Sequence, residues 1–202
     1  MGILLGVLAP LKVFNDAALA VGRFLAMLAL AIMVCFILAQ VFFRYVMNDA
    51  LPWPDEAARF MMLWMTGLIA PAAYRQGGFV AIDMFERALP SRIALGVSLA
   101  LMGVSLVVLV YLLRIGWSEV TGFAGSFKTA SLYTFIQPSW SNMNIEFGLA
   151  KMPRSHMMAS LVFGLSLMIV VNIELVLRTF VHLLGGGDRL QPLNETDMAG
   201  AE

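Results

Sequence analysis

The residues best suited to surface chemistry lie in a Pro-bracketed turn that opens a predicted helix. Asp55 and Arg59 are four residues apart, and Glu56 and Arg59 are three apart. Either carboxylate can therefore pair with the guanidinium on one helix face. Together with flanking residues they form a candidate cluster for docking a partner protein: Arg44, Trp53, Asp55, Glu56 and Arg59. Capping and anchoring of the helix end is the alternative interpretation.

Residues that suit catalysis or cofactor binding are sparse. His156 and His182 lie 26 residues apart on one predicted helix, which is about 39 Å at helical rise, so they cannot ligate one haem iron. The segment from Gly164 to Met168 contains a serine but lacks the second glycine of a nucleophile elbow. The sequence therefore predicts no enzyme, no metal site and no cofactor.

Composition decides the class of protein. Of 202 residues, 60% are hydrophobic and 13% are charged, and the mean hydropathy is +0.85. A soluble domain carries about 25% charged residues, so this chain is predicted to be an integral membrane protein. Thirteen basic and thirteen acidic residues cancel, which gives no support for binding to nucleic acid. The single cysteine, Cys35, excludes an intrachain disulfide.

Apolar runs predict an all-α fold of four transmembrane helices plus short interfacial amphipathic helices. The first run, Phe24–Phe43, has twenty residues and can cross a ~30 Å hydrocarbon core. The second, Phe60–Tyr74, has only fifteen, so its helix is expected to begin earlier, near Pro54. The predicted spans, in one domain of residues 1–184, are about 20–46, 54–76, 91–115 and 155–182.

The connecting segments are expected to lie along the membrane surface. Residues 11–22 and 79–89 each have one apolar and one polar face, as interfacial helices do. The connection 116–153 is rich in aromatic residues, which favour the headgroup level, so it is expected to fold back on the interface or on a partner. Residues 185–202 are predicted to be a disordered tail. Further predicted interfacial anchors are Trp64, Arg87 and Trp140.

Glu174 is the most unusual charge, because it lies inside a hydrophobic stretch, where a carboxylate is a functional candidate. Arg178 follows four residues later and can neutralise it. We interpret the two as a structural intramembrane ion pair. So few buried ionisable groups provide no polar pathway, which disfavours a stand-alone channel or transporter.

Orientation follows from basic residues in short loops. With the N-terminus inside, seven basic residues lie inside and six outside, and the short loop with Arg75, Arg87 and Arg92 has three against two in the Arg44–Arg59 loop. This slight excess favours cytoplasmic N- and C-termini.

An ordered set of residues resembles a known family. It comprises Arg44-Tyr45, Leu51-Pro52-Trp53-Pro54-Asp55-Glu56, Ala58-Arg59, Trp64, Gly67, Tyr74-Arg75, Gly78 and Val80, Ile82 and Asp83. Combined with four spans, the set resembles the small membrane subunit of tripartite ATP-independent periplasmic (TRAP) transporters, the DctQ-like family. The resemblance is best over residues 20–115. It is weaker in Gln137-Pro138-Ser139-Trp140, at Pro153 and in the final span.

The resemblance implies a non-catalytic subunit in a bacterial inner membrane, with both termini cytoplasmic. Such a subunit braces a large multi-span permease, which receives solute from a periplasmic solute-binding protein. Uptake in the family is driven by an ion gradient, usually sodium, and precedent points to an organic anion as substrate.

The resemblance also implies where the candidate residues lie. It places the docking cluster at the periplasmic end of the first two spans, and Arg75 and Asp83 on the cytoplasmic side as anchors.

The alternative function, from another class, is a membrane-anchor subunit of a redox enzyme complex. A Soret band in the purified protein would favour that alternative.

Overall fold

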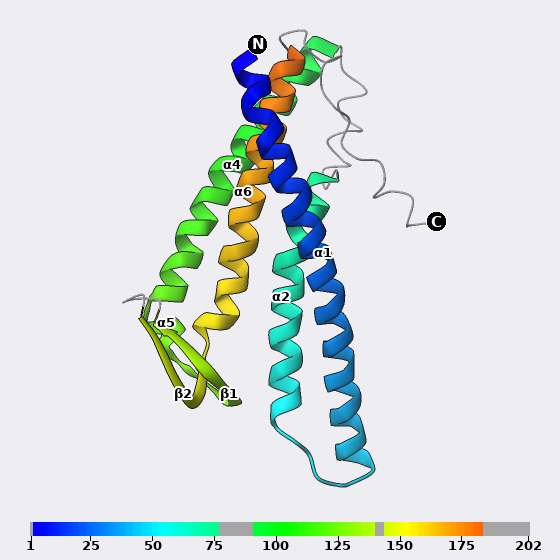
Figure 1. Cartoon of the computed structure of the whole chain (residues 1–202), viewed down its shortest axis with the longest axis vertical. Coiled ribbons are helices and arrows are strands. Elements are labelled where there is room, and N and C mark those ends of the chain that lie inside the picture. The colour runs from blue at the N-terminus through cyan, green and yellow to red at the C-terminus, as the bar shows by residue number, and fades with distance from the viewer. Residues whose placement is uncertain (1, 77–90, 140–143, 184–202) are drawn as a thin grey trace.

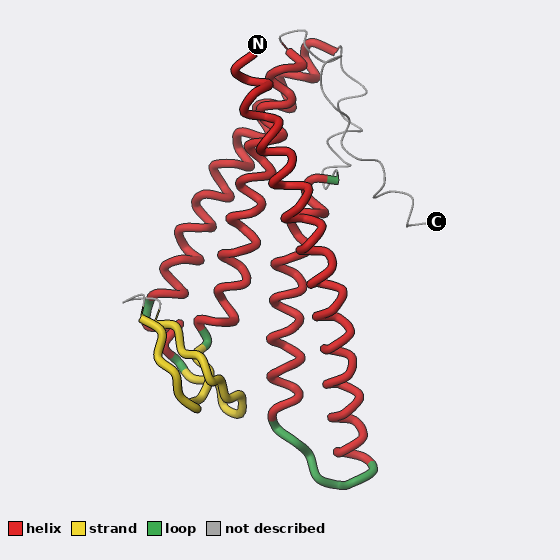
Figure 2. Tube along the Cα trace, viewed as in Figure 1, coloured by secondary structure: helices red, strands yellow, loops and turns green. Residues whose placement is uncertain are grey.

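A computed structural model of the chain describes residues 2–76, 91–139 and 144–183. Within these residues, four long helices alternate in direction and one β-hairpin caps one end (Figures 1 and 2). The helices are α1 (Gly2–Tyr45), α2 (Trp53–Arg75), α4 (Ser91–Thr121) and α6 (Ser155–Leu183). A short helix, α5 (Phe123–Ser126), leads from α4 into strands β1 (Lys128–Ser139) and β2 (Asn144–Pro153).

Three of the described helices are long and apolar enough to cross a membrane. The candidate spans are Leu8–Tyr45, Gly96–Thr121 and Ser155–Val181. The predicted second span, 54–76, coincides with α2. Two carboxylates and a guanidinium in its first two turns make α2 less apolar than the other three, and it is not among the candidates.

Helix α1 is one continuous helix that includes residues 11–22, so these residues do not form a separate helix, and their expected place along the membrane surface stays a prediction. Its 44 residues correspond to a length of ~66 Å. Asn15 and Asp16 interact with residues of α6 and α2, which removes the need for these polar groups to face lipid headgroups. No proline follows Pro10 in α1, so nothing local interrupts the helix before Tyr45.

The connection 116–153 contradicts the all-α prediction. Helix α4 continues past residue 115 and ends at Thr121, and the connection then forms an antiparallel hairpin in which Lys128 lies opposite Pro153 and Gln137 opposite Glu146. Strand β1 contains threonine, tyrosine, phenylalanine and isoleucine, which favour strands. The aromatic content that suggested an interfacial segment therefore also encodes a strand.

Some predicted features lie outside the described residues. They are the interfacial segment 79–89, the tail 185–202, and the anchors Asp83, Arg87 and Trp140.

The helices pack as two antiparallel pairs, α1 with α2 and α4 with α6, joined by contact between α2 and α6. Helices α2 and α6 run in the same direction and approach closely at glycines. A Cβ atom at Gly67 would lie 2.5 Å from the carbonyl oxygen of Ser160, and one at Gly164 would lie 2.6 Å from that of Gly67. Small residues that bring backbones together are a common means of helix association in membranes.

Candidate functional site

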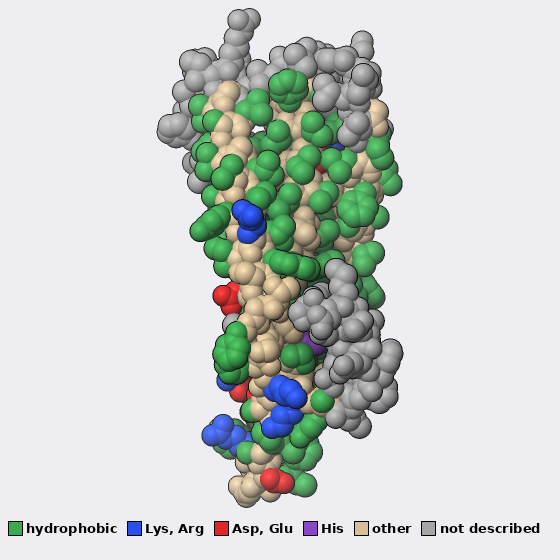
Figure 3. Space-filling view, turned by 90° about the vertical axis from the view of Figure 1, so that its left-hand side faces the viewer, with side chains coloured by type: hydrophobic (Ala, Val, Ile, Leu, Met, Phe, Trp, Pro, Cys, Tyr) green, Lys and Arg blue, Asp and Glu red, His purple; other side chains and the backbone are tan. Residues whose placement is uncertain are grey.

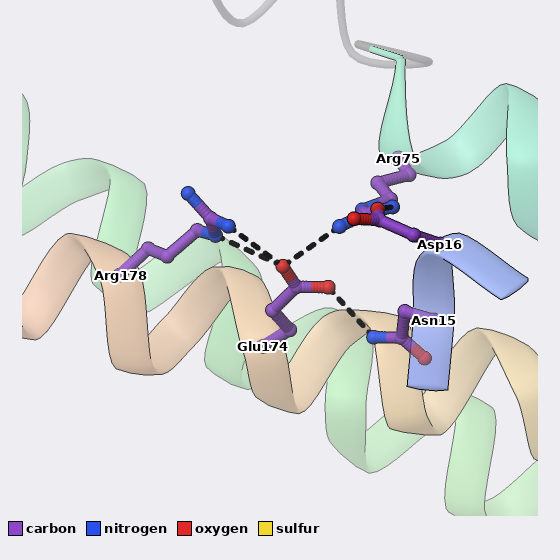
Figure 4. Close-up of polar contacts among 5 residues, drawn as sticks. All are labelled: Asn15, Asp16, Arg75, Glu174 and Arg178. Carbon is purple, nitrogen blue, oxygen red and sulfur yellow. Dashed lines mark hydrogen bonds and ion pairs between the residues drawn. The ribbon is translucent and has the colours of Figure 1, made fainter. Parts of the chain in front are cut away.

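Glu174 lies at the centre of a charged network that joins three helices (Figure 4). Its side chain is fully buried, with an exposed fraction of 0%. One carboxylate oxygen accepts a hydrogen bond from Nδ2 of Asn15 at 2.6 Å. The other lies 2.9 Å from Nη2 of Arg75 and 2.9 Å from Nη2 of Arg178. The structure thus brings Glu174 and Arg178 together, and adds partners from α1 and α2.

Arg75 connects this network to a second carboxylate. It is the last residue of α2, and its guanidinium pairs with both Glu174 and Asp16. Its side chain is only 10% exposed, so both carboxylate partners of its guanidinium come from within the chain. The two negative carboxylates and the two positive guanidinium groups cancel in net charge. Such pairing is needed to offset the free energy of removing buried charges from water.

A neighbouring polar contact joins α2 and α6, one residue before Arg75 and two residues before Glu174. Nδ2 of Asn172 donates a hydrogen bond to the hydroxyl oxygen of Tyr74, and both side chains are buried. Tyr74 also packs with Leu19 and Val171 in the apolar core. Three helices are therefore fixed in register here by polar and apolar contacts together. This arrangement is suited to rigidity, although Nε of Arg75 and Oδ1 of Asn172 are buried without a hydrogen-bond partner among the described residues.

The opposite end of the molecule carries the predicted docking cluster. The turn between α1 and α2 includes Asn48 with φ of 52°, a left-handed conformation that asparagine tolerates better than most residues. Pro54 then occupies the first turn of α2, where its missing N–H costs nothing. Asp55 and Glu56 follow in the same turn, so both carboxylates lie at the favourable end of the helix dipole.

Glu56 binds the β-hairpin and does not pair with Arg59. Its carboxylate accepts hydrogen bonds from the backbone N–H groups of Ala130, Ser131 and Leu132 at 3.1, 2.8 and 3.1 Å. The hydroxyl of Ser131 adds a contact of 2.6 Å. These amides belong to an irregular part of β1, where they are not used by the ladder. Three successive N–H groups aimed at one carboxylate form an anion-binding nest.

The other members of the predicted cluster are only partly brought together. Asp55 and Arg59 form an ion pair at 2.7 Å, with side chains 49% and 70% exposed. Trp53 contacts the ring of Phe36 edge-on. The guanidinium of Arg44 lies over the Tyr45 ring, 5.8 Å from its centre. Arg44 and Trp53 therefore stabilise α1 and the turn, while the two acids have separate partners.

Trp64, predicted to be an interfacial anchor, packs between two helices. It lies in the middle of α2, and its ring is between those of Phe60 and Phe163. Its Nε1 atom is buried and has no hydrogen-bond partner among the described residues. Trp64 is a contact between α2 and α6.

Sequence reasoning missed the distant partners of both charged sites. Asn15 and Asp16 appeared to be the polar face of a surface helix, and Ser131 belonged to an unassigned segment. A signal was present for the first two, because a polar pair within an otherwise apolar helix calls for polar partners. The sequence has no comparable signal for the contact between Glu56 and the hairpin, because most of the hydrogen-bond donors are backbone amides, which every residue type except proline carries.

Comparison with known proteins agrees with the arrangement of apolar helices. A search of curated proteins gives no significant match. The sequence model of one family, described as tripartite ATP-independent periplasmic transporters, DctQ component, matches residues 33–182. The match extends from the last part of α1 to the end of α6 and so includes the hairpin. It includes the docking cluster and the network around Glu174, but Asn15 and Asp16 of that network lie before it. This match covers more than half of the chain, so the protein belongs to the DctQ family and is a small permease subunit of a TRAP transporter.

Proposed function

We propose that this chain is a non-catalytic subunit that braces the large permease subunit of an uptake system and helps to dock its periplasmic solute-binding protein. The system is driven by an ion gradient, which family precedent gives as sodium, and transports an organic anion. The observation that carries the docking role is the bond between Glu56 and the hairpin. This bond attaches the hairpin to α2 and so gives one end of the molecule a fixed surface.

We further propose that α2 is a fourth membrane crossing. Its 23 residues correspond to ~35 Å, enough for a ~30 Å hydrocarbon core. The charges at its two ends are neutralised within the chain: Asp55 pairs with Arg59, and Arg75 pairs with Glu174. Glu56 has its amide nest. The helix can therefore lie in the membrane although its composition is less apolar than that of its neighbours.

The bracing role rests on the buried network near the other end. A moving permease requires a support that does not deform, and the network fixes α1, α2 and α6 in one register. Both termini are proposed to be cytoplasmic, which puts the network toward the cytoplasm and the hairpin toward the periplasm. This orientation agrees with the small excess of basic residues in the loop between α2 and α4.

The first experiment is a pull-down of the tagged chain from its native membrane in mild detergent. We expect a multi-span permease to co-purify in roughly stoichiometric amount. The complex is then reconstituted in liposomes with its binding protein, and uptake of the organic anion is measured with and without a sodium gradient. Co-purification of a redox enzyme instead would contradict the proposal.

The docking surface is tested by Asp55→Ala combined with Arg59→Ala, which changes its exposed charges but leaves Glu56 and the hairpin in place. We expect uptake per assembled complex to fall several-fold while co-purification of the permease is unchanged. Lys12→Ala, at the opposite end of α1, is the control and should preserve uptake. Uptake at the wild-type level in the double variant would show that this ion pair is only structural.

A further inference from the structure

A cationic pocket lies where the start of α2, the base of the hairpin and the start of α6 meet. Its volume is about 340 Å³, and Arg59, Lys128 and Arg154 line it together with Glu56. Three amides and a hydroxyl already bind the carboxylate of Glu56. That carboxylate therefore cannot turn toward all three cations, and the pocket retains a positive potential.

Backbone contacts hold the main chain in place at the two cations at the base of the hairpin, Lys128 and Arg154. The N–H of Arg154 donates to the carbonyl of Phe127 at 2.8 Å, and Lys128 lies opposite Pro153 in the sheet. Both cationic side chains are exposed, and the described part of the chain gives neither of them an ion-pair partner. Arg59 contacts Asp55 through Nη2, which leaves further N–H donors of its guanidinium for a ligand.

An apolar cleft of about 620 Å³ lies among α2, α4 and α6. Trp64 and Phe163 line it from α2 and α6, and Arg114 and Trp117 line it from α4. Trp64 follows Arg59 by five residues on α2, so the cleft lies about 7 Å farther along this helix than the cationic pocket. The two helix pairs diverge toward this end of the molecule (Figure 1).

The surroundings of the cleft are those of a membrane surface. Helices α4 and α6 are both long and apolar enough to span a bilayer. On the face on the α4 side, apolar side chains are spread over the upper part, and most of the charged side chains lie in the lower part, toward the hairpin end (Figure 3). Arg114 is exposed seven residues before the end of α4, where a long cationic side chain can reach a headgroup.

We propose that the cationic pocket and the apolar cleft together bind one anionic phospholipid. The phosphate lies among Arg59, Lys128 and Arg154, and an acyl chain lies in the cleft against Trp64 and Phe163. Two volumes of about 340 and 620 Å³ are in the usual size range of small-molecule sites, about 300–1,000 Å³.

A phospholipid fits both features at once. An acidic side chain of a docking protein would use the cations but leave the apolar cleft empty. A helix of the large permease would fill the cleft but has no need of three cations at its end. The inference is independent of the transport activity, because it depends only on this chain and the bilayer around it.

The test uses the full-length chain, purified in mild detergent and studied by native mass spectrometry. We expect one retained phospholipid per chain, and phosphatidylglycerol to bind in preference to phosphatidylcholine when each is added. Lys128→Gln and Arg154→Gln should each weaken phosphatidylglycerol binding about fivefold, the factor that corresponds to ~1 kcal/mol for a basic residue near an anionic surface.

Lys151→Gln is the matched control. Lys151 is an exposed cation on β2 that does not line the pocket, and its replacement should change phosphatidylglycerol binding less than twofold. Equal binding to the wild type and to the Lys128→Gln, Arg154→Gln double variant would overturn the proposal. Displacement of the lipid on assembly with the large permease would also overturn it, because the cleft would then be a protein interface.

A second measurement keeps the proposal testable if the double variant folds poorly. In a variant that retains Trp64 as its single tryptophan, with phenylalanine at the other tryptophan positions, phosphatidylglycerol with brominated acyl chains should quench the fluorescence, because Trp64 lines the cleft. Brominated phosphatidylcholine at the same concentration should quench it less. Equal quenching by the two lipids would show that the cleft contacts bulk lipid without selecting a headgroup, and would overturn the proposal.

Discussion

Glu174 illustrates how one buried carboxylate can be tolerated in an apolar chain. Its partners come from residues 99 and 159 positions away as well as from the next turn of its own helix. An isolated carboxylate at this position would have a large unfavourable free energy of desolvation. The attraction of its partners offsets this free energy only while all of the partners are present. The network is therefore sensitive to the loss of a single member, and it specifies one arrangement of three helices.

At the residue scale we predict that Glu174→Gln destabilises the protein strongly. The substitution leaves Arg75 and Arg178 buried with one carboxylate between them, and breaking a buried charge network in this way costs about 3–5 kcal/mol. The midpoint of unfolding by sodium dodecyl sulfate in mixed micelles, followed by circular dichroism, measures the effect.

Asp55→Asn is the matched control for Glu174→Gln. It removes a carboxylate from an exposed ion pair, and such pairs contribute about 0–1 kcal/mol. Comparable shifts of the unfolding midpoint in the two variants would mean that the buried network contributes no more to stability than a surface pair.

At the element scale, the contact between α2 and α6 depends on small side chains. Gly67 approaches Ser160 and Gly164 so closely that a Cβ atom on either glycine would meet backbone oxygen within 2.6 Å. Backbone cannot move aside as a flexible side chain can. The close approach also places Tyr74 beside Asn172 farther along the same two helices, so the glycines set the register that the polar contacts then fix.

We predict that Gly67→Ala destabilises the packing of α2 on α6 by about 1–3 kcal/mol, the usual cost of overpacking. Gly103→Ala is the matched control, because nothing lies within 4 Å of a Cβ atom at Gly103 of α4. That change should be neutral or stabilising by up to about 1 kcal/mol, since alanine favours helix over glycine. The same unfolding assay compares them, and an equal response would refute the close-packing argument.

At the scale of the whole molecule, the helices alternate in direction. The α1–α2 turn and the hairpin therefore share one end, and the N-terminus and the end of α6 share the other (Figure 1). In a membrane this arrangement requires the turn and the hairpin to face the same compartment. The amide nest of Glu56 joins these two segments directly, which excludes a bilayer between them.

We predict that cysteines at Asp49 and Lys151 react from the same side of the membrane. In a Cys35→Ala background, a membrane-impermeant maleimide should label Asp49→Cys and Lys151→Cys in intact spheroplasts. Gly6→Cys, near the N-terminus, should react only after lysis. Labelling of Asp49→Cys and Lys151→Cys from opposite sides would show that the alternating arrangement is wrong.

The sequence by itself determined the class of protein, the approximate positions of the four long helices and the family. These are local or additive properties: an excess of apolar residues, their uninterrupted runs, and the ordered residues between Arg44 and Asp83 that resemble the family. The pair of Glu174 with Arg178 could also be foreseen, because four residues on one helix set the distance between two side chains.

Only the tertiary structure decided which groups meet across the chain. The hairpin was missed because an aromatic-rich segment suits both a strand and a membrane interface. Three features depend on partners that lie 59 to 159 residues away in the sequence. They are the continuity of α1, the pairing of Arg75 with a second carboxylate, and the amide nest that binds Glu56. Spacing along one element fixes its own faces, whereas pairing between elements is set by packing, which no local pattern records.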